Sequence, residues 1–346
     1  MNKHFWAALM ILSCHHSWGS AVMAHDTARD SEQITVAILG DSRSDGQSGV
    51  EGVNVEVLSK LFTMVKGKNP CALFFCGDLT LGLEDEEVAS NLYQDNVSTP
   101  PAQKTPKGDH WAQKGFVYNA TAFKANLDHF SVLQKQYLGP SIPLYPLIGN
   151  HEAVGLDAVK IFKDHFEITH EAPLDSSQLA YTVEIGKSLF IILATDYYSR
   201  DENKLIEHTL AGGQKEWLEK TLRDKSPKFS SVFVIGHEPA FTVLGAVKSH
   251  PVGLDQFSQA RDEFWGILKK YGVKAYICCH EHLYQSSKHD GVWQIISGGA
   301  GAPLAPPAFG GFFHYALLDI PTINGHAPKL TIVDLDGTIK DEVVLE

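Results

Sequence analysis

The sequence lacks an apolar run long enough to cross a bilayer as a helix, which takes about 20 consecutive apolar residues. The run at residues 5–12 is too short and no later stretch is long enough, so we predict no transmembrane segment. Internal repeats and low-complexity tracts are also missing. With 346 residues, of which 44% are hydrophobic and 20% charged, the composition is that of an ordinary globular protein.

Basic residues are in short supply. The chain has 29 lysines and arginines against 41 aspartates and glutamates, which gives a net charge of -12. This balance argues against nucleic acid as the main partner, because phosphate backbones require basic surfaces. It does not exclude a small phosphate substrate, since bound metal cations reverse the sign of an acidic pocket locally.

The first 24 residues are expected to be a signal peptide. Lys3 supplies a positive charge, residues 5–12 form the apolar core, and residues 22–24 place a small residue before the cleavage site. We therefore expect one mature domain over residues 25–346 that is periplasmic or secreted.

Cysteine is scarce as well, with five in the chain. The first, Cys14, follows a weak lipobox at residues 11–13, so a lipid anchor at Cys14 is a minor alternative. The other four lie in or beside apolar runs and are expected to be buried free thiols: Cys71, Cys76, Cys278 and Cys279. Export would permit disulfides, although Cys71 and Cys76 are too close on one predicted strand to bridge easily.

Short apolar runs alternate with amphipathic stretches, which is typical of an α/β fold. Continuous apolar runs predict strands buried on both faces, at residues 34–39, 72–75, 144–148, 231–235 and 275–278. We also expect two strands within residues 181–193 and a strand-rich tail from residue 292 to 346. A polar, proline-containing stretch at about residues 84–115 is interpreted as an inserted surface loop.

Polar clusters follow five of the predicted strands. In chain order they hold Asp41, Asp78, Asn150, His237 and the pair His280 and His282. Ligands bind beyond the carboxyl ends of strands in open α/β sheets, and oxygens mixed with imidazoles suit Mn, Fe or Zn. Each cluster alone has a structural explanation, such as a turn at Asp78, a helix cap at Asn150 or a partly buried histidine at His237. His280 and His282 would share one face if they lay on a strand.

This ordered set resembles the calcineurin-like metallophosphoesterase superfamily, which includes purple acid phosphatases and many bacterial phosphodiesterases. The family pattern runs Asp-x-His, Gly-Asp, Gly-Asn-His-Asp/Glu, His and Gly-His-x-His, and the resemblance covers about residues 34–304. It implies a β-sandwich of two mixed sheets flanked by helices. It also implies two metal ions, with Mn, Fe and Zn as the candidates.

The resemblance also implies a role for each matching residue. Asp78 would bridge the two metals. The remaining ligands would be Asp41 and His282 at the first site, and Asn150, His237 and His280 at the second. His151 would contact the substrate and protonate the leaving group, oriented by Glu152.

Two positions depart from the family pattern. Cys279 replaces the glycine before His280, which should matter little because only backbone packing is required there. Arg43 stands where the family has a metal-binding histidine, and an arginine cannot ligate a metal because it stays protonated. We expect Arg43 to hold a phosphate oxygen of the substrate; the alternative is a pair with Asp45 outside the pocket.

The expected function is an exported metal-dependent phosphoesterase that cleaves a small phosphate mono- or diester with a metal-activated hydroxide. One alternative is a purple acid phosphatase-like monoesterase, although the tyrosine of that group is missing after Gly77-Asp78. The other is a degenerate relative that binds phosphate or metal without turnover.

Overall fold

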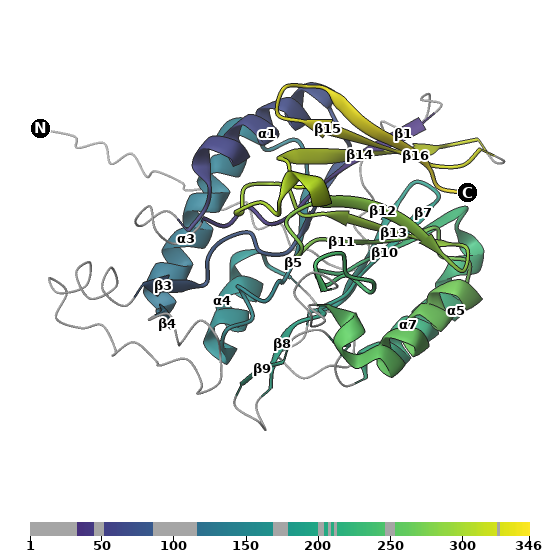
Figure 1. Ribbon diagram of the computed structural model, residues 1–346, viewed down its shortest axis with the longest axis horizontal. Helices are drawn as coiled ribbons and strands as arrows, with labels where there is room; N and C mark the ends of the chain where they lie inside the picture. Colours follow the sequence, from purple (N-terminus) through teal and green to yellow (C-terminus); the bar gives the residue numbers. More distant parts are fainter. Residues whose placement is uncertain are drawn as a thin grey trace, which may run out of the picture.

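The computed structural model describes residues 33–44, 52–85, 116–168, 179–199, 204–206, 209–210, 213–245, 253–323 and 326–346. Two six-stranded sheets form the centre of the molecule, with helices on their outer faces (Figure 1). The predicted signal peptide, Cys14 and most of the predicted insertion lie outside the described residues. Within the described ranges, no helix is both long and apolar enough to cross a membrane.

The first sheet is mixed and has the strand order β16-β15-β14-β1-β2-β5. Its strands are β1 (Gln33–Leu39), β2 (Ala72–Cys76), β5 (Leu144–Leu147), β14 (His314–Pro321), β15 (Lys329–Asp334) and β16 (Ile339–Val344). β1, β2 and β5 run parallel to one another, so their carboxyl ends lie at the same edge. β14 pairs with β1 in the antiparallel sense and starts the C-terminal meander.

The second sheet has the order β12-β13-β11-β10-β7-β6. Its strands are β6 (Tyr181–Ile185), β7 (Ser188–Ile192), β10 (Ser231–Ile235), β11 (Ala275–Cys278), β12 (Tyr284–His289) and β13 (Val292–Ser297). The four inner strands are parallel, and the two edge strands are antiparallel to their neighbours. The prediction of a sandwich of two mixed sheets is confirmed.

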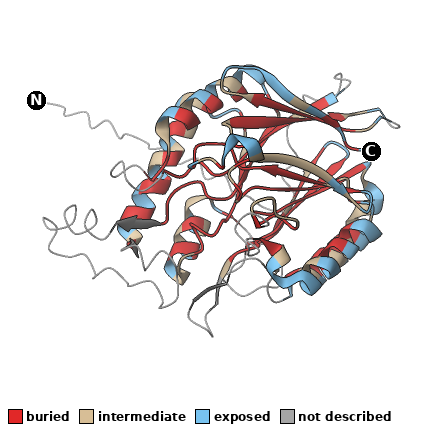
Figure 2. Ribbon diagram, in the orientation of Figure 1, coloured by how far each residue is buried: buried red, intermediate tan, exposed pale blue. Residues whose placement is uncertain are grey.

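The helices divide between the two sheets. The first sheet is covered by α1 (Val55–Lys68), α3 (Ala120–Leu133), the π-helical turn Gln134–Leu138 and α4 (Leu156–His165). The second sheet is covered by α5 (Gln214–Lys225) and α7 (Ser258–Lys270), as Figure 1 shows. Shorter 3-10 turns occur at Ser226–Lys228, Leu254–Phe257 and Pro307–Phe309. β2, β7, β10 and β11 are buried along their whole length, whereas the helices expose one face (Figure 2).

Alternate residues of one strand serve two separate cores. On β7, Phe190 and Ile192 pack between the sheets, whereas Leu189 and Ile191 pack under α5 and α7. This follows from the two-residue period of a strand, which points successive side chains to opposite faces. Within the sandwich, the Phe190 ring stacks on Phe74 of the other sheet, with 4.5 Å between ring centroids. The contact joins the two sheets at the middle of β2 and β7.

Two small hairpins complete the fold. β3 (Leu83–Asp85) pairs with β4 (Phe116–Tyr118), and β8 (Tyr197–Ser199) pairs with β9 (Lys204–Ile206). The first hairpin corrects the start of the predicted insertion, because residues 84 and 85 belong to β3. The end of β3 and the start of β4 therefore lie side by side, with Asp85 paired to Phe116.

The four cysteines within the described residues are free, as the sequence predicts. Cys76, Cys278 and Cys279 are fully buried. A side-chain carbon at Gly40 would come within 2.2 Å of the Cys279 sulfur. Position 279 therefore accommodates a cysteine because position 40 is a glycine.

Candidate metal centre

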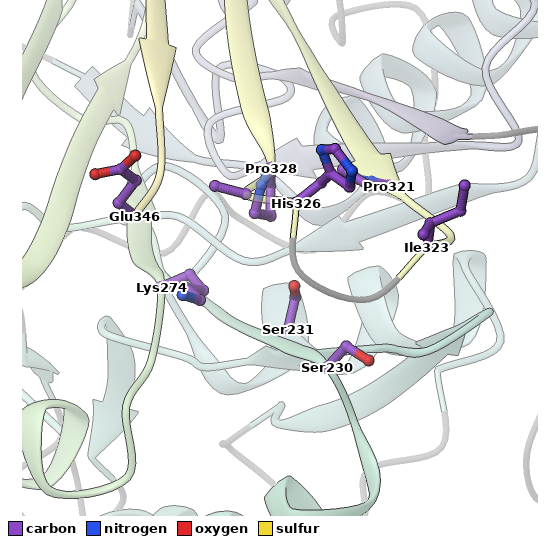
Figure 3. Close-up of a pocket in the computed structure, with 9 residues that line it drawn as sticks. Ser230, Ser231, Lys274, Pro321, Ile323, His326, Pro328 and Glu346 are labelled. Carbon is purple, nitrogen blue, oxygen red and sulfur yellow. The ribbon is translucent and has the colours of Figure 1, made fainter.

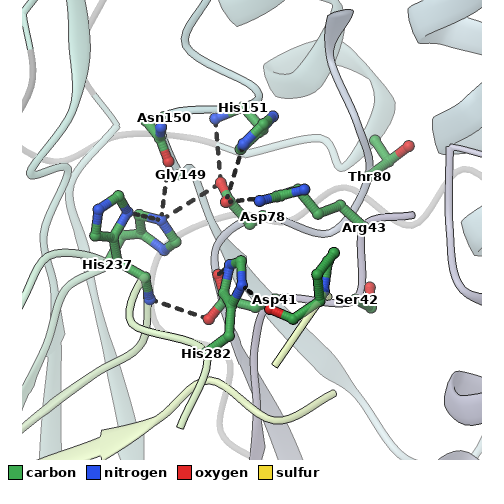
Figure 4. Close-up of polar contacts among 12 residues, drawn as sticks. Asp41, Ser42, Arg43, Asp78, Thr80, Gly149, Asn150, His151, His237 and His282 are labelled. Carbon is green, nitrogen blue, oxygen red and sulfur yellow. Dashed lines mark hydrogen bonds and ion pairs between the residues drawn. The ribbon is translucent and has the colours of Figure 1, made fainter. Parts of the chain in front are cut away.

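All six predicted ligand side chains meet at the carboxyl ends of the strands. Five of them, all but His280, are labelled in Figure 4. β1, β2, β5, β10 and β11 lead respectively to Asp41, Asp78, Asn150, His237 and the pair His280 and His282. The two sheets contribute to one cluster because their parallel strands end at the same edge. His280 and His282 lie in the turn after β11 and not on a strand, so alternation along a strand does not explain their proximity.

Three of these residues have a strained backbone. Asp41, Asp78 and His280 have positive φ angles of 60°, 49° and 61°. A non-glycine residue in this region costs on the order of 1–3 kcal/mol and persists only where its surroundings hold it. Here the turns are bonded to one another: the Asp41 N–H donates to the Gly77 carbonyl at 3.1 Å, and the His280 N–H donates to Asp41 Oδ2 at 3.0 Å.

The orientation of His237 is fixed by the strand below it. Its Nδ1 lies 2.8 Å from the Cys76 carbonyl oxygen, which can only accept, so Nδ1 carries the proton. In the neutral ring Nε2 therefore keeps its lone pair. That lone pair faces Asn150 Oδ1 at 3.2 Å and Asp78 Oδ1 at 3.4 Å. Three electron-rich atoms that converge in a fully buried place fit a cation between them.

The same argument applies to His282. Its Nδ1 donates to the Pro303 carbonyl at 2.7 Å, which leaves the Nε2 lone pair directed at Asp41 Oδ1 at 3.7 Å. Asp41 is fully buried, and its Oδ1 accepts no hydrogen bond from the described residues. Burial, and then the nearby charge of Asp78, raise the pKa of Asp41 well above its usual value. A cation at this position would offset both effects.

Two groups of donors thus fit metal ions. One contains Asp41, Asp78 and His282, and the other contains His237, Glu238 and His280; within each group the donor atoms lie within 4.8 Å of one another. Carboxylates, an amide oxygen and imidazoles are the donors that Mn, Fe and Zn accept. Asp78 belongs to the first group, and its Oδ1 also lies 3.4 Å from His237 Nε2 of the second group.

From the sequence we expected Glu152 to orient His151, but in the structure Glu152 binds backbone N–H groups instead. Its carboxylate accepts hydrogen bonds from the backbone N–H groups of Asp78 at 3.0 Å, Thr80 at 3.1 Å and Gly149 at 2.9 Å. Burial raises the pKa of Glu152 to about 8, and the Asp78 charge adds to this, while the three N–H groups oppose it. Glu152 is therefore a positioning residue for the turn that carries Asp78.

His151 lies directly beside Asp78. Its backbone N–H donates to Asp78 Oδ1 at 3.1 Å, and its Nε2 is 3.8 Å from Asp78 Oδ2. The side chain is buried at the side of the centre that Asn150 also reaches (Figure 4). This position is compatible with proton transfer to a group held at the centre.

Arg43 points into the centre, as predicted. Its Nε is 3.6 Å from Asp78 Oδ2, and its Nη1 donates to the Ser44 carbonyl at 3.2 Å. Only 8% of the residue is exposed. Asp45, the alternative partner, lies outside the described residues. A fixed positive charge thus stands beside the central carboxylate.

The prediction from the sequence left out two residues that shape the centre. Glu238, next to His237, contributes to the second group of donors. The Thr195 hydroxyl accepts from the N–H groups of His237 at 3.2 Å and Glu238 at 3.0 Å, and so fixes the turn after β10. The position of Glu238 next to the predicted ligand His237 was a signal for its role. Thr195 follows β7 and lies in no motif, so the sequence gives no signal for it.

A cavity of about 570 Å³ lies away from this centre (Figure 3). It opens at the amino ends of β10 and β11, opposite the strand ends that carry the ligands. Its lining includes Ser230, Ser231, Lys274, His326, Pro328 and Glu346. None of the predicted site residues lines it.

The strand-end donors and the two-sheet sandwich define an α/β protein with two candidate metal sites at one edge of its sheets. The sequence profile of the calcineurin-like phosphoesterase family matches residues 10–284, and the chain belongs to that family.

Individual relatives are distant. The chain is 24% identical to tartrate-resistant acid phosphatase type 5 of Oryctolagus cuniculus over 169 aligned residues. The aligned region is 46% of this chain and 49% of that protein. It is 26% identical over 178 residues to sphingomyelinase phosphodiesterase C of Dictyostelium discoideum, over 47% of this chain and 39% of that protein. The chain thus aligns with about half or less of these relatives. A purple acid phosphatase from yellow lupin (Lupinus luteus) shares the fold, with a TM-score of 0.58, 14% identity, and coverage of 93% of this chain and 54% of that chain.

Proposed function

We propose that this protein is a metal-dependent phosphoesterase that hydrolyses a small phosphate mono- or diester. The observation that carries the proposal is the convergence of lone pairs at one buried point. His237 Nε2 lies within 3.4 Å of Asp78 Oδ1, and His282 Nε2 faces Asp41 Oδ1, with both ring protons held by backbone carbonyls. This arrangement fits two metal ions of the Mn, Fe or Zn type.

Bound metal ions would supply positive charge for the phosphate oxygens and lower the pKa of the attacking water. The chain's own residues divide the other tasks. Arg43 presents a planar guanidinium that can hold a phosphate oxygen. His151 can donate a proton to the leaving oxygen. Glu152 and Thr195 keep the ligand turns in place through backbone N–H groups.

Both ester classes are represented among the relatives. An acid phosphatase and a sphingomyelin-type phosphodiesterase each match about half of this chain. On this basis we propose that the substrate is either a phosphate monoester or a phosphate diester. The missing tyrosine after Asp78 makes the purple acid phosphatase-like monoesterase the second candidate.

Arg43 also supports a third candidate, a relative that binds phosphate or metal without turnover, because it replaces a family ligand. The retained donors favour the enzyme. We also propose export to the periplasm or the medium, supported by Lys3, the apolar residues 5–12 and residues 22–24.

One preparation tests the proposed function. The full chain is purified without chelators, its metal content is measured by elemental analysis, and p-nitrophenyl phosphate is compared with bis-p-nitrophenyl phosphate. We expect up to two metals per chain and turnover of at least one ester that chelation abolishes and Mn²⁺ restores. Metal with no turnover of either ester would favour the binding protein. A surface variant, Asp224→Asn, serves as the control for handling and should match the wild type.

A further inference from the structure

We propose that Glu238 is a ligand of the second metal, so that this site has five protein donors: Asp78, Asn150, His237, His280 and Glu238. This rests on the proposed function, and it adds a carboxylate that the family pattern does not contain at this position.

The backbone of Glu238 is fixed on both sides. Its N–H donates to the Thr195 hydroxyl at 3.0 Å, and its carbonyl accepts from the Tyr276 hydroxyl at 2.6 Å. The residue is fully buried. Its carboxylate is thus held inside the molecule at the end of β10, next to the predicted ligand His237.

The spacing of the donor atoms fits one coordination sphere. Ligands bound at about 2.0–2.2 Å to one ion lie roughly 3.0–3.5 Å apart when they are neighbours in the sphere. His280 Nδ1 is 3.2 Å from Glu238 Oε1 and 3.3 Å from His237 Nε2. His237 Nε2 is 3.2 Å from Asn150 Oδ1. The distance from Glu238 to His280 thus equals the spacing between the other donors, as expected for a ligand of the same ion.

The alternative role is that of an outer partner that orients His280. A carboxylate in that role bonds the ring nitrogen that does not face the metal. His237 shows this arrangement, because its Nδ1 bonds the Cys76 carbonyl and its Nε2 faces the other donors. Glu238 instead approaches Nδ1 of His280, the same nitrogen that faces His237. It therefore lies on the metal side of the ring.

A second carboxylate changes what the site prefers. Five protein donors exceed the four that Zn²⁺ takes in most closed sites. Carboxylate and amide oxygens beside two imidazoles favour Mn or Fe. Arg43 stands in place of a histidine ligand of the first site, so the first site has fewer protein donors than the second. We therefore expect the second site to bind its metal more tightly.

The test measures Mn²⁺ binding to the chelator-stripped full chain by calorimetry and by electron paramagnetic resonance. We expect Glu238→Gln to weaken the tighter class of sites by at least about 10–100-fold, the range seen when even the partners of ligands are removed. The matched control is Asp255→Asn, a carboxylate that holds Thr242 and should leave Mn²⁺ affinity unchanged. Unchanged affinity and stoichiometry in Glu238→Gln would overturn the proposal, while the proposed function would stand.

A second measurement does not depend on the variant folding. In wild-type crystals soaked with Mn²⁺, anomalous density should place an ion within about 2.5 Å of a Glu238 carboxylate oxygen. An ion bound by His237 and His280 but more than about 3.5 Å from Glu238 would overturn the proposal. A wild-type chain that binds no metal and cleaves neither ester would overturn the proposed function together with this inference.

Discussion

The Nε of Arg43 lies 3.6 Å from Oδ2 of Asp78, a carboxylate of the first donor group whose Oδ1 is 3.4 Å from His237 Nε2 of the second. A permanent positive charge therefore occupies the place where related proteins are expected to hold a metal-binding histidine. Because it is nearly buried, this charge acts on the centre with little screening by water.

Arg43→His should raise metal occupancy of the first site and weaken the hold on the substrate. The imidazole can ligate, whereas loss of a charged hydrogen bond costs about 1.5–3 kcal/mol, which corresponds to roughly 10–100-fold in KM or kcat/KM. Metal titration and steady-state kinetics check both effects, and Arg43→Lys separates charge from the planar shape. Identical metal content and kinetics in Arg43→His would show that the side chain has no part in the reaction.

Asp78 and His151 should differ in what their loss removes. Asp78→Ala is expected to lose at least one metal per chain and nearly all activity, since Asp78 is a donor of the first group and lies 3.4 Å from His237 of the second. His151→Ala should keep the metals and slow turnover by roughly 10²–10⁴-fold, the usual contribution of proton transfer. Elemental analysis measures the metal content of each variant, and kcat measured on the same samples gives its turnover. The reverse pattern, with metals lost from His151→Ala and kept by Asp78→Ala, would refute these roles.

His314 should make stability depend on pH. Burial lowers its pKa to about 4, and the Phe312 carbonyl, which accepts from Nδ1, opposes this only in part. Between pH 4 and about 6.5 the unfolded chain binds a proton that the folded chain does not, so stability is complete above pH 6.5 and is lost as the pH falls toward 4. The loss is about 3 kcal/mol.

Urea denaturation at pH 7 and pH 4.5 measures this effect of His314. His314→Gln should lower stability at pH 7 but flatten the fall between the two pH values. An equally steep fall in the variant would assign the pH dependence to other groups.

The proposed export predicts a mature N-terminus near His25. Edman sequencing or intact mass of the natively expressed protein measures it. A product that begins at Met1 in the cytoplasm contradicts export, and a lipid-modified Cys14 would replace cleavage after Ala24 with an anchored form.

The strands and most of the site were predictable because their signals are local. Continuous apolar runs such as residues 72–75 favour strands buried on both faces, and polar residues directly after parallel strands share the carboxyl edge. The partners of a buried carboxylate are set by tertiary structure instead. Glu152 was expected to serve His151, yet it bonds the backbone around Asp78. Thr195 lies 42 positions before His237, and no short motif links them.

The hairpin of β3 and β4 holds the two chain positions that flank residues 86–115 next to each other. Leu83 pairs with Tyr118 and Asp85 with Phe116, so the strands fix the distance between the two ends of this stretch. The entropic cost of closing such a loop changes by only about 0.6 kcal/mol for each doubling of its length. Segments of very different length can therefore be grafted onto this stem while the strands that carry Asp78 and Asn150 keep their register.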